Sequence, residues 1–123
     1  MTENTYFFDT YAIMEVLVGN ENYRDYAGKY IVLTKLNIFE MYYIVLRDFG
    51  ENKAKEAFDR YYGSAVDYGP EVIKEAAEFR LENKKKNLSM TDCIGYIISK
   101  KLRIRFLTGD KEFERMKNVE FVK

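Results

Sequence analysis

The chain has 123 residues, of which 47% are hydrophobic and 16% aromatic, and its 20 basic side chains balance its 20 acidic ones. This composition indicates a single globular domain over residues 1–123 and excludes a disordered chain. There is no histidine and only one cysteine, Cys93, which excludes imidazole-based catalysis and an internal disulfide and argues against a structural zinc site. Any catalysis would therefore rest on carboxylates, and hence on a hard cation.

The cellular location is predicted from what the sequence lacks. The N-terminal residues do not have the basic and apolar regions of a secretory signal, and no stretch is apolar enough to span a membrane. A lone cysteine is compatible with a reducing compartment. We therefore expect a cytoplasmic protein with no membrane partner.

Short apolar segments alternate with amphipathic segments along the chain. Thr34 is a suitable N-cap and Gly50 a suitable stop for one long helix between them. The alternation predicts βαβ units and a parallel sheet, which makes this an α/β chain. The predicted strands are 5–8, 30–33, 104–107 and 119–122, with a weak candidate at 64–68. The predicted helices are 11–18, 35–49, 52–62, 70–83 and one that begins near residue 89, with short helices within 21–29 and at 111–116.

Four acidic residues are predicted to gather at one edge of this sheet. Asp9 and Asp110 each follow a strand, and ligands of parallel sheets bind beyond the carboxyl ends of the strands. Asp92 opens the helix that leads into the strand before Asp110, so its helix start lies at the same edge. Glu40 is the only charge in the apolar stretch 38–46, and burying a charge is costly unless it is paired or binds a metal.

Each acidic residue also has a purely structural explanation. Asp9 and Asp110 can be helix N-caps, and Ser89-x-x-Asp92 fits a capping box. Glu40 can have an Arg or Lys partner that the sequence does not reveal. The convergence of all four favours a metal site instead, because clustered carboxylates repel one another unless a cation neutralises them. Oxygen ligands of this kind favour Mg²⁺ or Mn²⁺.

Basic and aromatic residues add two further hypotheses. Positive charge is concentrated in the C-terminal half, where a solvated face is the usual explanation and phosphate contact is the alternative if the residues flank the acidic edge. The aromatic residues are numerous for one small core, and some of them are expected to line a two-fold interface. The basic residues are Lys84, Lys85, Lys86, Lys100, Lys101, Arg103 and Arg105, and the aromatic ones are Tyr42, Tyr43, Tyr61 and Tyr62.

The order of these motifs resembles the PIN-domain family, and in particular its small VapC-type toxin ribonucleases. The matching segments are Phe7-Phe8-Asp9-Thr10, a mid-helix Glu40 about thirty residues on, Leu88-Ser89-x-x-Asp92, and Leu107-Thr108-Gly109-Asp110-Lys111-Glu112-Phe113. Together they span nearly the whole chain. The sequence departs from the family pattern in two regions. Tyr11 stands where the family often has Asn or Ser, and Cys93, Gly95, Tyr96 and Ile97 stand where it often has small alanines.

The resemblance implies a three-layer fold with a parallel sheet of about four to five strands and helices on both faces. It implies an acidic metal pocket made by Asp9, Glu40, Asp92 and Asp110, with Thr108 as a supporting hydroxyl, Glu112 as an outer acidic group and Ser89 beside Asp92. It further implies Mg²⁺- or Mn²⁺-dependent RNA cleavage, a homodimer and a cognate antitoxin. The expected reaction is hydrolysis by a metal-activated water, leaving 5′-phosphate and 3′-hydroxyl ends.

Three other functions are open at this stage. The chain can be a non-catalytic PIN-like module that binds RNA or protein, although all four acidic positions are present. It can be a free-standing RNA-processing nuclease without an antitoxin. A phosphoryl-transfer domain with an aspartyl nucleophile is disfavoured, because Tyr11 occupies the place of the second Asp that a haloacid-dehalogenase-like enzyme needs.

Overall fold

A computed structural model describes residues 4–123, and the sheet within them is four-stranded and entirely parallel. Its strands are β1 (Thr5–Phe8), β2 (Tyr30–Val32), β3 (Arg105–Thr108) and β4 (Val119–Phe121), in the spatial order β2-β1-β3-β4. The chain therefore leaves β1 toward one side of the sheet and later returns to its other side, which makes the gap between β1 and β3 a topological switch point. Ligands of open parallel sheets bind at such a point, beyond the carboxyl ends of the strands.

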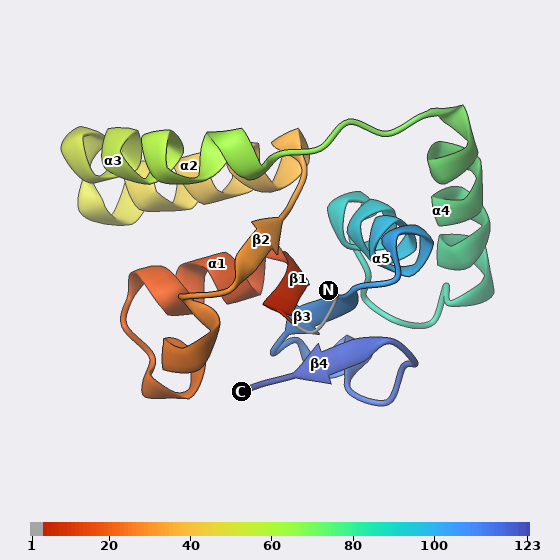
Figure 1. The fold of residues 1–123 in the computed structure, drawn as a ribbon. Coiled ribbons are helices and arrows are strands. Elements are labelled where there is room, and N and C mark those ends of the chain that lie inside the picture. Colours follow the sequence, from red (N-terminus) through yellow and green to blue (C-terminus); the bar gives the residue numbers. More distant parts are fainter. Residues whose placement is uncertain (1–3) are drawn as a thin grey trace.

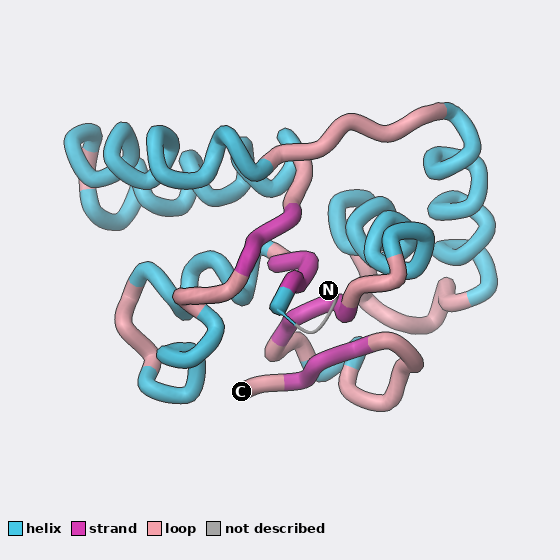
Figure 2. Tube along the Cα trace, viewed as in Figure 1, coloured by secondary structure: helices cyan, strands magenta, loops and turns pink. Residues whose placement is uncertain are grey.

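Helices cover both faces of the sheet, as Figure 1 shows. One side of the sheet carries α1 (Thr10–Leu17), α2 (Lys35–Phe49) and α3 (Glu51–Tyr61), and the other carries α4 (Pro70–Glu82) and α5 (Met90–Leu102). The strands are short, and the tube in Figure 2 shows helices on both sides of them, with loop segments beside the edge strand β4. This arrangement confirms the predicted three-layer α/β fold.

Alternation along the strands divides the core into two halves. Phe7 and Phe106 point to the α4–α5 side, whereas Phe8 and Leu107 point to the α1–α3 side, because successive strand residues face opposite ways. The rings of Phe7 and Phe106 stack with centroids 5.6 Å apart. Helix α5 lies close against them at Gly95, where an added Cβ would stand 2.6 Å from Cε1 of Phe7. Strands β1 and β3 are thus held firmly, and so are the residues that follow them.

The long helix α2 begins and ends where the sequence predicts. Thr34 caps it by accepting a hydrogen bond from the Asn37 amide, and the side chain of Asn37 accepts in return from the Thr34 amide. Gly50 ends it with φ at 92°, a conformation that favours glycine. Helix α3 then folds back against α2, and the two form the hairpin at the left of Figure 1.

The predicted strand at 64–68 is wrong. A short 3₁₀ turn, η3 (Tyr62–Ser64), is followed by a single bridge between Leu33 and Ala65. The segment meets β2 only beyond its last paired residue and then turns away toward Gly69 and the start of α4, so no ladder can form.

Smaller differences concern element type and boundaries. The helices expected within 21–29 and at 111–116 are short 3₁₀ segments, η2 (Glu21–Tyr26) and η4 (Lys111–Phe113). The strand expected at 104–107 is displaced by one residue, because the left-handed residue Arg103 ends α5 and Ile104 still bonds to that helix through the Ser99 carbonyl. No helix within residues 4–123 is long and apolar enough to cross a bilayer.

Candidate active site

Asp9 is a deeply buried carboxylate of the predicted site. It follows β1 directly, and its amide donates to the Leu107 carbonyl at 3.2 Å, which ties it to the end of β3. Its side chain is 3% exposed and accepts from the Ala12 amide at 2.8 Å, so Asp9 is the N-cap of α1. Burial raises the pKa of this carboxyl to about 8, although the hydrogen bonds from Thr108 and Ala12 oppose the rise.

Thr108 joins Asp9 to Asp110. The fully buried Thr108 hydroxyl hydrogen-bonds to the Asp9 carboxyl and accepts the Asp110 amide at 3.0 Å. Asp110 in turn accepts the Glu112 amide at 3.0 Å, which makes Asp110 the cap of η4. One hydroxyl at the end of β3 therefore orients the two carboxylates that follow the two central strands.

Asp92 approaches from the other side of the sheet on the first turn of α5. The capping box is present: Asp92 accepts the Ser89 amide at 3.0 Å, and the Ser89 hydroxyl accepts the Asp92 amide at 3.0 Å. Burial raises the pKa of Asp92, and the negative charges of Asp110 and Glu40 raise it further. Asp92 is thus a cap that also lies within electrostatic reach of two other predicted site residues.

Glu40 is held in place by hydrogen bonds among uncharged side chains. Its carboxylate accepts the Thr10 hydroxyl at 2.5 Å, and Thr10 in turn accepts the side-chain amide of the buried Asn37 at 3.1 Å. Asn37 lies one turn before Glu40 on α2. No Lys or Arg among residues 4–123 forms an ion pair with Glu40, so the basic partner that would have explained it structurally is not found there.

The four carboxylates influence one another. Asp92 and Asp110 both raise the pKa of Asp9, and Asp110 and Glu40 both raise that of Asp92. Within the described residues none of the four has an Arg or Lys within ion-pair distance. A neutralising positive charge at this edge would therefore have to come from outside residues 4–123.

The four carboxylates are not arranged as a preformed set of metal ligands. In the part of the chain that the structure describes, no three acidic or cysteine side chains are arranged so that they could hold one metal ion. Each of the four instead points at least one oxygen to a local donor: the amides of Ala12, Ser89 and Glu112, and the Thr10 hydroxyl. The residue types and their common edge suit a hard cation, but the side chains would have to turn inward to share it.

Glu112 lies at the rim rather than among the four. Its carboxylate accepts the Asn87 amide at 3.2 Å, and its carbonyl lies 3.4 Å from Nζ of Lys86. The turn after β3 is thereby fastened to the loop before α5. This contact sets the distance between Asp110 and Asp92, which lie on the two joined segments.

Sequence reasoning missed two residues of the site. Thr10 donates to Glu40 and accepts from Asn37, but from the sequence Thr10 was recognised only as part of the motif Phe7-Phe8-Asp9-Thr10, and Asn37 was not recognised. The available signal was the Thr34-x-x-Asn37 capping box, which places a buried amide one turn before Glu40 on the same helix.

Tyr11, which stands where the family often has Asn or Ser, packs against the turn after β3. Gly109 lies under the Tyr11 ring and close to the Val122 carbonyl, where no side chain would fit. Burial raises the pKa of Tyr11, and the charges of Glu15, Asp9 and Asp110 add to the rise. A large ring therefore closes the side of the site toward the C-terminus.

The basic residues fall into two groups. Lys100, Lys101, Arg103 and Arg105 lie at the end of α5 and the start of β3, which is the edge opposite to the acidic one. Two of them are paired, Lys101 with Glu75 at 2.6 Å and Arg105 with Glu120 at 3.7 Å. Of the seven basic residues singled out in the sequence, Lys84 to Lys86, in the loop before α5, are the ones that flank the acidic edge.

The four tyrosines proposed for an interface differ in their exposure to solvent. Tyr61 is 1% exposed and belongs to the core, and Tyr42 packs edge-to-face on Phe58. Tyr43 and Tyr62 are exposed, at 56% and 45%. Phe39, at 72%, lies one turn before Tyr43 on α2, so an apolar surface remains there.

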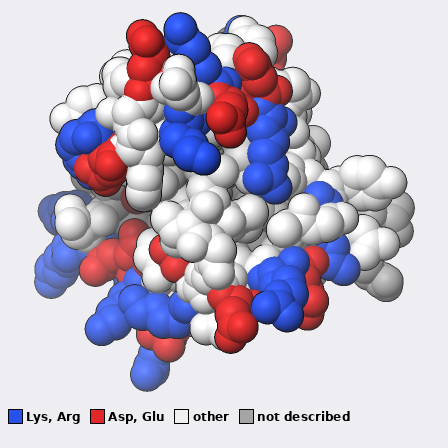
Figure 3. Space-filling model, turned by 90° about the vertical axis from the view of Figure 1, so that its left-hand side faces the viewer, with Lys and Arg blue, Asp and Glu red and all other residues white. Residues whose placement is uncertain are grey.

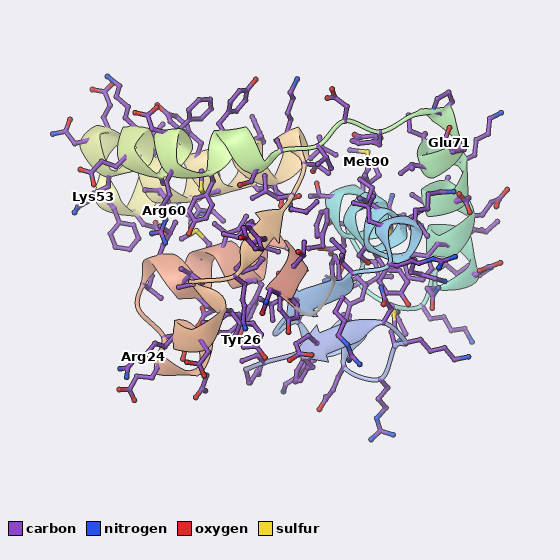
Figure 4. The ribbon with its side chains drawn as sticks, viewed as in Figure 1. Arg24, Tyr26, Lys53, Arg60, Glu71 and Met90 are labelled. Atoms are coloured by element: carbon purple, nitrogen blue, oxygen red, sulfur yellow. The ribbon has the colours of Figure 1, made fainter. Side chains whose placement is uncertain are left out.

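A groove of about 580 Å³ lies between α1 and the α2–α3 hairpin. Its lining is apolar from α1 and α2 and charged from α3: Met14, Leu17, Val18, Val45 and Phe49, then Lys53, Glu56, Ala57 and Arg60. Figure 3, which faces this end of the molecule, shows an uncharged area in the middle with Lys, Arg, Asp and Glu above and below it. In Figure 4 Arg60 extends from α3 toward α1, across the groove, and Lys53 lies near the outer end of α3.

Solved structures share this fold. The chain superimposes on VapC20 of Mycobacterium tuberculosis, described as a sarcin–ricin loop cleaving toxin, with a TM-score of 0.76 and 18% identity over 96% of this chain and 99% of that one. The TM-score is 0.74 for VapBC2 of Rickettsia felis bound to a promoter DNA fragment, at 15% identity over 97% and 99% of the two chains. It is also 0.74 for a toxin–antitoxin complex from Klebsiella pneumoniae, at 16% identity over 94% and 95%. No curated protein matches the chain. A family model, the PIN domain, matches residues 6–119, and the chain therefore belongs to the PIN-domain family.

Proposed function

We propose that this protein is a divalent-metal-dependent endoribonuclease and the toxin of a toxin–antitoxin pair. The observation that carries the proposal is the electrostatic influence between Asp9, Glu40, Asp92 and Asp110, with no Lys or Arg among residues 4–123 paired to any of them. Membership of the PIN-domain family supports it, as do the similar structures, which include an RNA-cleaving toxin and toxin–antitoxin complexes.

Asp9, Glu40, Asp92 and Asp110 would hold Mg²⁺ or Mn²⁺, because both ions prefer carboxylate oxygens. The donor set fits this use: a buried carboxyl with a raised pKa and no basic partner is stabilised when a cation binds. A divalent cation bound there would make a water acidic enough to attack a phosphodiester and would offset the charge on the leaving oxygen.

The chain's own side chains would orient this set. Thr108 holds Asp9, Thr10 holds Glu40, and the Ser89 amide holds Asp92, so these three carboxylates would turn toward a shared cation from fixed starting positions. Glu112 would act from the rim by fixing the loop that carries Ser89. With no histidine in the chain, activation of the RNA 2′-hydroxyl by an imidazole is not available. The expected products are therefore 5′-phosphate and 3′-hydroxyl ends.

The product chemistry tests the proposal. A structured RNA incubated with the protein and Mn²⁺ should give fragments with 5′-phosphate ends, and EDTA should stop the reaction. Asp9→Asn should be inactive, whereas Asp59→Asn, an exposed carboxylate on α3, should cleave like the parent. Cyclic 2′,3′-phosphate ends, or cleavage that persists in EDTA, would overturn the mechanism.

The proposed partner is a cognate antitoxin, and the groove between α1 and the α2–α3 hairpin is where we expect it. Its apolar lining with Lys53 and Arg60 at the rim suits an amphipathic segment that carries an acidic residue. The product of an adjacent small reading frame should co-purify with this chain. Val18→Asp, at 56% exposure in the groove, should abolish co-purification, whereas Ile73→Asp on α4, at 53% exposure, should not. The absence of such a reading frame would favour a nuclease without an antitoxin.

Two further properties belong to this proposal. We expect a homodimer, in which Phe39, Tyr43 and Tyr62 would be covered, because exposed aromatic residues are enriched at interfaces. We also expect the protein to act in the cytoplasm, where its RNA substrate is found.

A further inference from the structure

The loop between α4 and α5 carries three consecutive lysines on an ordered turn. Lys84, Lys85 and Lys86 are all exposed. Asn83 closes the turn from within: its side-chain amide donates to the Phe79 carbonyl at 2.9 Å, and its own carbonyl accepts the Lys86 amide at 2.9 Å. The lysines therefore extend from a fixed backbone.

This loop is fastened to the acidic edge at two points. On one side, Asn87 and Lys86 bond to Glu112, whose amide bonds to Asp110. At its end, the Ser89 amide bonds to Asp92. The loop thus borders the proposed metal site along the segment that joins Asp110 to Asp92.

The lysines of this loop differ from other lysines of the chain in their pairing. Lys35, Lys55 and Lys101 lie within 4.0 Å of a carboxylate. Lys84 and Lys85 have no carboxylate within that distance among residues 4–123. Lys86 is used in the contact with the Glu112 carbonyl, which leaves its two neighbours available to a ligand.

Two more cations lie beside the loop without an ion pair in the described chain. Lys111 directly follows Asp110 and is exposed. Arg80 donates to the Leu88 carbonyl at 3.2 Å, which places it behind the same loop. The basic wall formed by Arg80, Lys84, Lys85 and Lys111 therefore borders a site that would otherwise repel a polyanion.

We propose that Lys84 and Lys85 bind the backbone phosphates of the RNA strand next to the bond that is cut, with Arg80 and Lys111 adding to the same basic wall. The inference rests on the proposed function and deepens it by naming the positioning residues for the substrate. Exposed ammonium groups contact phosphate without reading bases, so they supply affinity and placement rather than sequence choice. Their contribution falls as salt rises, because binding releases counterions from the RNA.

The test measures binding and cleavage separately in the full-length protein. Binding of a short fluorescent single-stranded RNA is followed by anisotropy in EDTA across salt concentrations. The double variant Lys84→Gln/Lys85→Gln should bind about tenfold more weakly at low salt, and its plot of log affinity against log salt should be shallower by about 1.4, since each phosphate contact contributes about 0.7 for single strands. In Mn²⁺ the same variant should raise KM with kcat nearly unchanged.

Two controls make the result specific. Lys55→Gln/Lys100→Gln removes the same charge from α3 and from the end of α5, away from the acidic edge, and should leave affinity, salt slope and KM unchanged. Lys84→Arg/Lys85→Arg keeps the charges and should keep the affinity. Equal losses in the two Gln variants, or a KM for Lys84→Gln/Lys85→Gln like the parent's, would overturn the inference.

The outcomes also separate this inference from the proposed function. If the parent cleaves RNA and the loop lysines do not affect KM, the inference fails and the nuclease stands. If the parent binds RNA through these lysines but does not cleave it in Mn²⁺, the nuclease fails and the binding surface stands. A parent that binds no RNA contradicts both.

Discussion

Asp9→Asn should stabilise the metal-free protein at neutral pH. The substitution keeps an oxygen to accept the Ala12 amide but removes a titratable carboxyl that is 3% exposed and has no basic partner in the described chain. Burial raises the Asp9 pKa from 3.8 to about 8. Neutral pH lies roughly three units above the unfolded pKa and below the folded pKa, so the buried carboxyl must take up a proton when the chain folds. One unit is about 1.4 kcal/mol, so this proton uptake costs the fold about 4 kcal/mol. We expect Asp9→Asn to raise the free energy of unfolding by about 2–4 kcal/mol. The lower end of this range allows for a weaker hydrogen bond between the Asn side chain and Thr108.

The sign of the pH dependence follows from the raised pKa. The folded state holds the Asp9 proton more tightly than the unfolded state does, so unfolding releases a proton between about pH 4 and pH 8. The contribution of Asp9 to stability is fully present below about pH 4, declines as pH rises, and is lost above about pH 8. Urea unfolding in EDTA across this range should show the parent losing stability relative to Asp9→Asn. The two proteins should be close to equal near pH 4.

The control and the metal complete this test. Asp59→Asn, at an exposed position of α3, should follow the parent at every pH. Mn²⁺ should stabilise the parent by about 2.7 kcal/mol at a hundred times its dissociation constant, and Asp9→Asn much less. If Asp9→Asn is less stable than the parent at about pH 8 in EDTA, or if the difference does not change with pH, the argument from burial is refuted.

Four further results are expected. Asp92→Asn keeps the capping acceptor for Ser89, so it should be at least as stable as the parent without metal, gain much less from Mn²⁺ and fail to cut RNA; equal metal shifts in thermal melts would remove Asp92 from the site. Thr108→Val leaves the buried Asp110 amide unpaired and should cost about 1–3 kcal/mol in urea unfolding, which Thr108→Ser should largely restore. Gly95→Ala forces a methyl group against Phe7 and should destabilise by about 1–3 kcal/mol by the same assay. Light scattering at micromolar concentration should report a dimer that Tyr43→Ser weakens; a monomeric parent would contradict the interface and leave the nuclease untouched.

Most of the fold could be predicted from the sequence, because the local signals for each helix and strand agree with the overall alternation of strands and helices. Strand β1 and helix α2 have the predicted bounds. The β-branched and aromatic run defines the strand, and Thr34 and Gly50 define the two ends of the helix, so each local pattern indicates a single element. The failure at 64–68 has the opposite cause. Its residues suit a strand, but β2 ends at Val32 and offers only Leu33 as a partner, and no local pattern reveals how far a neighbouring strand extends.

The edge at which the acidic residues lie was predictable from the sequence, but their contacts were not, and their role as metal ligands stays a prediction. The alternation of strands and helices places Asp9, Asp92 and Asp110 at one edge of the sheet. Asp9 and Asp110 follow the carboxyl ends of parallel strands, and the helix that starts near Asp92 runs antiparallel to those strands, so it begins at the same edge. The Thr10 and Asn37 contacts of Glu40 depend on how α1 packs against α2. That contact joins residues about thirty positions apart, and a single sequence carries no signal for it.

The capping explanation and the metal explanation of these residues turn out to be compatible. Asp9 and Asp110 are N-caps, and Asp92 is the third residue of the capping box that begins at Ser89, so each of the three carboxylates accepts a backbone amide at the start of a helical segment. Such amides carry partial positive charge, which offsets part of the repulsion between carboxylates without any basic side chain. Each carboxylate has two oxygens, and a cap needs only one of them. A cation can therefore bind the remaining oxygens while the helix starts stay capped, and an Asn substitution can remove the charge while the fold keeps its caps.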